Sequence, residues 1–359
     1  GLLAEHYPAM KRYMQYLLEK CVNEETGIMD QGESWWGNLG DWLGPENLNN
    51  DATLLWETYF IYDLDIMRQT ADLLGHKEDA DRYAQLHKER IAFFNRTYID
   101  PETGNTRYAD IGKRVDTQTS YALPLAFGII PEKMRAKVTD RLINTLKREN
   151  KSDDGILCPP YSLMTGFIGT AWISRALSDC GYPDVAYRLL QQTSYPSWLY
   201  SVEQGATTIW ERLNSYTHTD GFGENNRMNS FNNYSFGAVG AWMYNCSLGI
   251  QPDIQAPGFK HFFLKPEPDP TGKMNYARGY YDSMYGRIES GWETTSQSVT
   301  YTFTIPANTS ATVCLPASGF KTVRMNRSTL QEGKDFQIEN GFIRMELESG
   351  TYEAEIMHK

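Results

Sequence analysis

The chain has 359 residues, of which 41% are hydrophobic, and this length and composition are typical of a globular protein with a substantial core. A net charge of −11 argues against nucleic acid as a partner, because phosphate binding needs clustered lysine and arginine. No stretch approaches the ~20 apolar residues of a membrane span, and the scattered cysteines and histidines lack metal-ligand spacing, so neither a span nor a metal site is expected.

Helical periodicity runs from residue 2 to about residue 250. It predicts helices over 3–21, 52–74, 77–99, 117–128, 131–149, 164–180, 183–204 and 233–248. Gly128, Gly181 and Gly249 fall where helices are expected to end. Apolar, aromatic helices alternate with charged, amphipathic ones, which is typical of a two-layer helical toroid with a buried inner ring. The loops that open the inner helices would then line one mouth of the toroid.

Residues 29–50 are rich in glycine, tryptophan and asparagine and are expected to form a long loop. Long loops in compact domains are usually functional or disordered. Trp35, Trp36 and Trp42 argue against disorder. The loop is therefore a candidate part of a binding site.

After Pro252 the periodicity changes from helical to the two-residue repeat of β-strands. Strands are expected over 259–264, 280–285, 287–292, 298–305, 310–315, 321–325, 336–338, 342–347 and 352–356. Turns are expected between them, for example at 306–308 and 339–341. So many short strands in about 105 residues favour a small antiparallel β-sandwich that supports the helical part. The predicted domains are residues 1–251 and 252–359.

The chemistry is expected to centre on residues 205–212, where Trp210, Glu211 and Arg212 follow one another. An indole can stack on the apolar side of a pyranose, while a carboxylate accepts hydrogen bonds from hydroxyls or takes a proton from water. A buried Glu–Arg pair that braces the fold explains the same residues equally well. The aromatic content of 13%, with 9 Trp and 23 Tyr, favours a carbohydrate surface, although large cores also accumulate aromatic residues.

Six motifs, taken together and in order, resemble the bacterial α-L-rhamnosidases of glycoside hydrolase family 78. They are Gly-Asp-Trp-Leu at 40–43, Asp-Thr-Gln-Thr at 116–119, Thr-Gly-Phe-Ile-Gly-Thr at 165–170, Tyr-Pro-Ser-Trp-Leu-Tyr at 195–200, the octapeptide at 205–212, and Ser-Phe-Asn-Asn-Tyr-Ser-Phe-Gly-Ala-Val-Gly at 230–240. The resemblance continues into the strands, through Ala-Pro-Gly-Phe-Lys at 256–260 and Tyr-Asp-Ser-Met-Tyr-Gly at 281–286. Each motif alone is a weak signal, and their ordered set is specific.

This resemblance implies an (α/α)6 barrel followed by a small β-domain. It also implies that terminal α-L-rhamnosyl bonds of glycosides or polysaccharides are hydrolysed with inversion and with neither metal nor other cofactor. Glu211 falls where the family places its general base. The family further implies a sugar pocket with Asp41 and Trp42 on its loop and, as residues around the sugar, Trp172, Trp198, Trp210 and Asn233. For the tryptophans, core packing is at least as good an explanation.

Three departures from the family pattern accompany the resemblance. The family's general acid lies in a stretch of the form Asp-Cys-Pro-x-Arg-Glu, upstream of the helix with which this chain begins, and no such stretch occurs in the 359 residues. Asn233 stands where histidine is common, and Ala241 where many members carry glutamate. About eight helices are expected against the twelve of a closed double ring, which predicts an incomplete toroid. Its open side would be covered by a preceding segment of the same protein, by a second copy, or by residues 35–42.

The first hypothesis is therefore the C-terminal part of an inverting α-L-rhamnosidase that holds the base Glu211 and has little activity alone. Substantial activity would point to Glu33 or Asp41 as a substitute acid. A non-catalytic rhamnose-binding or structural module is the main alternative. A weaker one is a hydrolase or lyase for acidic sugars, for which the motifs supply only Arg212 and Arg227. The few cysteines are compatible with cytoplasm and periplasm alike.

Overall fold

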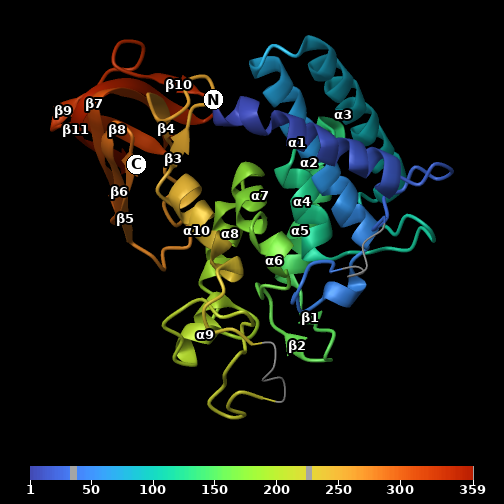
Figure 1. Cartoon of the computed structure of the whole chain (residues 1–359). Coiled ribbons are helices and arrows are strands. Elements are labelled where there is room, and N and C mark those ends of the chain that lie inside the picture. The colour runs from blue at the N-terminus through green and yellow to red at the C-terminus, as the bar shows by residue number, and fades with distance from the viewer. Residues whose placement is uncertain (33–38, 224–228, 359) are drawn as a thin grey trace. The chain divides into compact units, whose positions relative to one another are not determined.

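The structure is a computed structural model that describes residues 1–32, 39–223 and 229–358. The chain divides into two units, Gly1–Gly237 and Ala238–Lys359, which Figure 1 shows as mainly helices and mainly strands. The domain boundary expected after residue 251 stays a prediction. Among the described helices, none combines the length and the apolar character that a bilayer crossing requires.

The first unit is built from helical hairpins. Its helices are α1 (Leu2–Tyr16), α2 (Ala52–Leu73), α3 (Lys77–Tyr98), α4 (Gln118–Ala126), α5 (Glu132–Lys147), α6 (Phe167–Thr170), α7 (Ile173–Asp179), α8 (Pro183–Leu190) and α9 (Trp198–Glu203). Helices α2, α4 and α7 contact one another in succession, and each packs against the helix that follows it as its hairpin partner. Helix α4 is buried along nearly its whole length, whereas α3 buries only three residues. The predicted alternation of inner and outer helices is confirmed.

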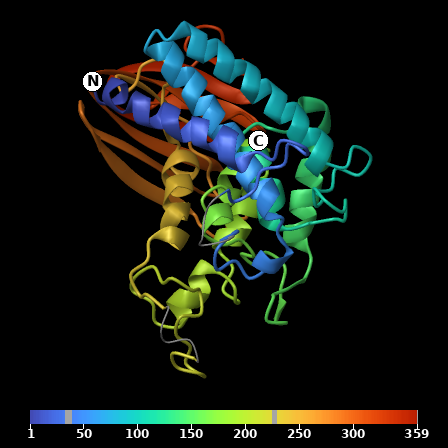
Figure 2. The ribbon, with the colours of Figure 1, turned by 45° about the vertical axis from the view of Figure 1, so that its right-hand side comes forward.

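Helix α1 lies along the hairpin of α2 and α3, as Figure 2 shows. Met14 of α1 belongs to the same buried cluster as Phe60 and Leu64 of α2. At the polar margin, the Tyr7 hydroxyl donates to Asp79 of α3 (2.8 Å). These contacts hold α1 in place through apolar burial on one side and a charge-assisted hydrogen bond on the other.

A buried ion pair joins α2 to α3. Glu57 of α2 is completely buried, and burial raises the pKa of its carboxyl group. Arg90 of α3 donates to this carboxylate through Nε (2.8 Å) and a second guanidinium nitrogen, and also to the Gly27 carbonyl (2.9 Å). Arg90 additionally lies over the ring of Phe93, 4.4 Å from its centroid. The charge of Glu57 is thus fully partnered, as a buried carboxylate requires.

Three of the predicted helices are interrupted. The helix expected over 164–180 forms α6 and α7, which are separated at residues 171–172. The helix expected over 183–204 ends with α8 at Leu190 and resumes as α9 at Trp198; Pro196, which cannot donate a helical hydrogen bond and restricts the residue before it, lies in the segment between them. The helix expected over 233–248 becomes a 3₁₀ turn (Ser235–Ala238), α10 (Val239–Trp242) and a π-helical turn (Met243–Ser247).

The second unit, apart from α10 and the turn after it, is a β-sheet domain. Its strands are β3 (Ile250–Pro252), β4 (His261–Leu264), β5 (Tyr276–Ser283), β6 (Gly286–Thr294), β7 (Ser298–Pro316), β8 (Phe320–Met325), β9 (Ser328–Thr329), β10 (Gln337–Glu339) and β11 (Phe342–His358). All of these pairings are antiparallel except that of β4 with β7, which is parallel. A predominantly antiparallel β-domain after the helices agrees with the prediction.

Two long strands, β7 and β11, pair with each other along most of their length. The first half of β7 pairs with β6, and its second half pairs with β4. The predicted turn at 306–308 is wrong, because β7 continues through it; Asn308 adopts a left-handed φ of 61°, and a register shift between Glu348 and Gly350 of β11 lies nearby. Such irregularities bend a strand without ending it.

Candidate active site

A buried carboxylate, Asp41, fixes the loop before α2 to the start of α6. Its side chain is completely buried, and it accepts hydrogen bonds from the backbone N–H groups of Gly166 (2.7 Å) and Gly169 (2.9 Å). The Thr119 hydroxyl of α4 donates to the same carboxylate. Burial raises the pKa of Asp41, and the hydrogen bonds oppose this rise because they stabilise the charged form. The carboxylate therefore ties the loop to two inner helices.

Glycine is required at both backbone contacts. A Cβ atom at Gly166 would lie 2.1 Å from the Asp41 carbonyl oxygen, and one at Gly169 would lie 2.2 Å from the Thr119 hydroxyl oxygen. The N–H of the first α6 residue donates to the Trp42 carbonyl (3.0 Å), which adds a further link. Asp41, expected at the substrate and weighed as a substitute acid, holds the loop that carries Trp42, and a contact with a sugar stays a prediction.

The predicted base, Glu211, lies in a segment that runs beside residues 230–233. Its backbone N–H donates to the Ser230 carbonyl (2.8 Å), and the N–H of Asn233 donates to the Ile209 carbonyl (3.0 Å). The Ser230 N–H returns a hydrogen bond to the Glu211 carboxylate (2.7 Å). The side chain is half-buried. A charge-assisted bond therefore sets the direction of a carboxylate that is still partly open to solvent.

Two of the predicted sugar-contacting tryptophans are largely enclosed by protein. Trp210 is 7% exposed and meets Phe231 edge to face, with ring centroids 5.3 Å apart. Trp198 is 8% exposed, and its indole N–H donates to the Phe236 carbonyl (2.8 Å). The Trp210 ring thus packs beside Glu211, and the Trp198 ring is fixed to the turn that contains Phe236. A contact of either ring with a sugar stays a prediction.

The side chains of Trp172 and Asn233 also make hydrogen bonds to other residues of the chain. The Trp172 indole donates to the Tyr59 hydroxyl (3.1 Å), and its ring joins an aromatic cluster with Tyr59, Tyr62 and Phe127. The Asn233 side-chain oxygen accepts a hydrogen bond from the Ser235 backbone N–H (3.1 Å), at the start of the 3₁₀ turn. Their contacts with a sugar likewise stay predictions.

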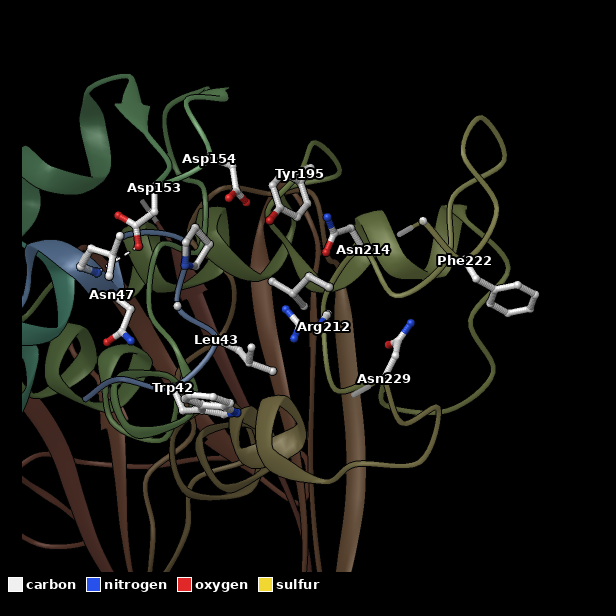
Figure 3. A pocket seen from close by; sticks show the side chains of 15 residues that line it. Trp42, Leu43, Asn47, Asp153, Asp154, Tyr195, Arg212, Asn214, Phe222 and Asn229 are labelled. Atoms are coloured by element: carbon white, nitrogen blue, oxygen red, sulfur yellow. Dashed lines mark hydrogen bonds between the residues drawn. The ribbon is translucent and has the colours of Figure 1, made fainter. Parts of the chain in front are cut away.

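A cavity of about 370 Å³ opens between the loop that carries Trp42 and the segment that follows Glu211 (Figure 3). Of the described residues, those that line it are Trp42, Leu43, Gly44, Pro45, Asn47, Leu48, Asp153, Asp154, Tyr195, Arg212, Leu213, Asn214, Phe222, Gly223 and Asn229. Glu211 does not line the cavity, although the next residue, Arg212, does. Trp42 alone among the predicted substrate residues reaches it.

The polar side chains of the cavity are held by their surroundings. Asp153 accepts a hydrogen bond from the Leu48 N–H (2.9 Å), and burial raises the pKa of its carboxyl group. Burial also raises the pKa of Tyr195 to about 12. Asn229 donates from Nδ2 to the Ser215 carbonyl (2.8 Å). Its Oδ1 is buried and has no hydrogen-bond partner among the described residues.

Comparison with known protein families shows which family this chain belongs to. Residues 1–247 match the bacterial alpha-L-rhamnosidase 6 hairpin glycosidase domain, and residues 249–329 match the bacterial alpha-L-rhamnosidase C-terminal domain. The chain belongs to the bacterial α-L-rhamnosidase family. The resemblance found in the sequence motifs is thereby confirmed.

Individual members of the α-L-rhamnosidase family align with nearly the whole chain. An alpha-L-rhamnosidase of Formosa agariphila is 31% identical over 98% of this chain and 36% of its own length, and one of Streptomyces avermitilis is 31% identical over 93% of this chain and 29% of its own. The solved Streptomyces avermitilis enzyme complexed with L-rhamnose is 30% identical, with a TM-score of 0.81 over 98% of this chain and 30% of that one. The Dictyoglumus thermophilum structure is 27% identical, with a TM-score of 0.82 over 99% of this chain and 37% of that one. The chain spans about a third of these relatives.

Most residues that line the cavity of this α-L-rhamnosidase family member were not among the site residues predicted from the sequence. Asn47 precedes α2, and Asp153 and Asp154 precede α6, so they lie in loops that open inner helices. The prediction that such loops line one mouth could have pointed to them. Glu33 and Arg227 lie outside the described residues. Within the described ranges, no group of three or more His, Cys, Asp or Glu residues is arranged to hold a metal ion.

Proposed function

We propose that this chain takes part in the removal of terminal α-L-rhamnose from glycosides or polysaccharides, with inversion and with Glu211 as the general base. The observation that carries the proposal is the half-buried Glu211 carboxylate, which the Ser230 N–H orients from 2.7 Å. Family membership and the L-rhamnose complex of a relative support the choice of sugar.

In the proposed reaction, Glu211 takes a proton from water while the water oxygen attacks the anomeric carbon. The bond between that carbon and the glycosidic oxygen breaks, and the leaving oxygen receives a proton from a general acid on the opposite side of the sugar. Asp41 is not assigned this second role, because it is completely buried and engaged by three donors. We assign the acid to a group outside the described residues.

The base can be tested separately from the acid by the choice of substrate. The leaving group of 2,4-dinitrophenyl α-L-rhamnoside departs without protonation, so its hydrolysis needs only the base and the sugar pocket. Glu211→Gln should lower the rate by about 10²–10⁴-fold. Glu203→Gln, a change on the exposed surface of α9, is the matched control and should retain the parent rate.

Azide provides a further test, because it attacks without losing a proton. In Glu211→Ala it should restore turnover of the dinitrophenyl substrate and yield a rhamnosyl azide of inverted configuration. Equal hydrolysis by the parent and Glu211→Gln proteins would overturn the role of Glu211. Binding of L-rhamnose without any turnover of this substrate, equal in both proteins, would instead establish a non-catalytic rhamnose-binding module.

The helical unit also exposes apolar side chains on α1, where Tyr13 is 55% and Tyr16 is 40% exposed. We propose that they pack against a further segment of the same protein, in keeping with the greater length of the relatives. Sedimentation of this chain alone should then show a monomer. A stable dimer that Tyr13→Glu dissociates would show that a second copy covers this surface.

A further inference from the structure

We infer that the cavity beside Arg212 binds a neutral, hydroxyl-rich sugar, namely the residue to which the terminal rhamnose is attached in the substrate. The inference rests on the proposed function and adds to it the chemical class of the group that leaves. Its basis is the position of the cavity relative to Glu211, its hydrogen-bonding groups and its balance of charge.

The cavity adjoins the base along the chain without containing it. Arg212 lines the cavity and directly follows Glu211, so their Cα atoms are ~3.8 Å apart. Trp42, on the loop held by Asp41, lines the same cavity. Figure 3 shows Arg212 near the centre of the view, with other lining side chains drawn around it. A substrate whose rhamnose is at Glu211 therefore has its next unit within reach of this space.

The lining offers both hydrogen-bond donors and acceptors. Asn214 brings an amide that both donates and accepts, and Asp154 brings a carboxylate that accepts. Asn47, whose Oδ1 accepts from the Asp41 N–H, adds its NH2 group as a donor, and Asn229, whose Nδ2 donates to the Ser215 carbonyl, adds its Oδ1 as an acceptor. Asn229 Oδ1 is buried and has no hydrogen-bond partner among the described residues, and it is the sharpest indication of a ligand, because an unmet buried acceptor costs about 1–3 kcal/mol. A sugar hydroxyl can donate to it. A flat hydrocarbon cannot.

The charges select against an acidic sugar. Among the described lining residues, two carboxylates, Asp153 and Asp154, face the cavity with one guanidinium, that of Arg212. Tyr195 adds no charge, because a phenol is neutral near pH 7. A uronate would bring a further negative charge to this set, whereas a neutral hexose can donate its hydroxyls to the carboxylates. The cavity therefore fits a neutral sugar.

The experiment measures binding by calorimetry, so it does not depend on turnover. The probes are L-rhamnose, a rhamnosyl-glucose disaccharide whose sulfur linkage resists hydrolysis, and the matching rhamnosyl-glucuronate. The disaccharide should bind at least tenfold more tightly than rhamnose. Asp154→Ala and Asn214→Ala should each remove most of that gain and leave rhamnose affinity unchanged, while Asp110→Ala, a change at an exposed turn, should alter neither. The rhamnosyl-glucuronate should bind more weakly than the rhamnosyl-glucose disaccharide. Asp154→Ala should reduce the difference in affinity between these two probes.

The outcomes separate this inference from the proposed function. If rhamnose binds and the disaccharide gains nothing, or if its gain survives both cavity variants, the cavity assignment is wrong while the rhamnose site stands. If rhamnose does not bind but the disaccharide binds and is weakened by Asp154→Ala, the cavity is a sugar site and the rhamnosidase proposal fails. Unchanged circular dichroism and melting temperature of the variants would show that lost affinity does not reflect unfolding.

Discussion

Replacing Asp41 with alanine tests whether the buried carboxylate holds the Trp42 loop. The change leaves the N–H groups of Gly166 and Gly169 buried without an acceptor, and it removes the partner of the Thr119 hydroxyl. An unsatisfied buried donor costs about 1–3 kcal/mol. The Thr119 hydroxyl can rotate toward another acceptor, so the expected loss of stability comes from the two N–H groups. The free energy of unfolding should therefore fall by roughly 2–6 kcal/mol.

The assay is urea denaturation of the helical unit, followed by tryptophan fluorescence, with Asp110→Ala as the exposed control. Asp41→Asn keeps one acceptor oxygen and should lose less stability than Asp41→Ala. Because burial raises the pKa of Asp41, its stabilising contribution is complete below the pKa of the unfolded chain and declines as pH rises toward the folded value. The difference between the parent and Asp41→Ala should thus be larger at pH 4 than at pH 8. A loss below about 1 kcal/mol, or one matched by Asp110→Ala, would refute the reasoning.

Three further changes probe other buried contacts. Burial raises the pKa of Glu46 to about 8, so the free energy of unfolding of the parent protein should decline as pH rises from about 5 to 8. Glu46→Gln should flatten that decline in urea titrations. Profiles of the parent and the variant that run parallel over this pH range would contradict this. Arg90→Ala leaves Glu57 charged or forces its protonation in the core, and should cost roughly 3–5 kcal/mol by the same titration; a loss near zero would show that the pair is dispensable. Gly169→Ala should lower the melting temperature and weaken disaccharide binding because its Cβ meets Thr119 at 2.2 Å, whereas Gly240→Ala, with open space around its Cβ, should do neither; equal effects would rule out the steric argument.

The sequence allowed the order of helices and strands to be predicted because those elements carry their own periodicity. The glycines at 128, 181 and 249, expected at helix ends, all have positive φ in the structure. Interruptions were harder to anticipate: the helix expected over 183–204 stops at Leu190 and resumes only after Pro196, whose ring is unfavourable in a helix interior. The long strands β7 and β11 were missed for the opposite reason. In β7 the turn-like residues 306–308 lie within a bent strand rather than at a hairpin, and in β11 the gap expected between 347 and 352 holds only a register shift.

The candidate site could be predicted only in part. The octapeptide motif pointed to Glu211, whose role stays a proposal, and the loop at 29–50 pointed to Trp42, which lines the cavity. Asp41 lies in a loop whose composition is typical of a binding site. The groups that donate hydrogen bonds to its carboxylate, however, belong to Gly166 and Gly169, more than a hundred residues away. Sequence spacing carries no information about such a contact. The asparagines and aspartates of the cavity converge in the same way, from separate loops.

The contact between Asp41 and Gly166 joins residues 125 positions apart, which has a consequence for synthesis on the ribosome. At 5–20 residues per second, roughly 6–25 s separate the appearance of the carboxylate from that of its backbone partner. During this interval the Asp41 side chain stays hydrated, because the N–H groups that compensate for its burial do not yet exist. The loop that carries Trp42 is therefore made early and takes its final place late, once the start of α6 has left the ribosome.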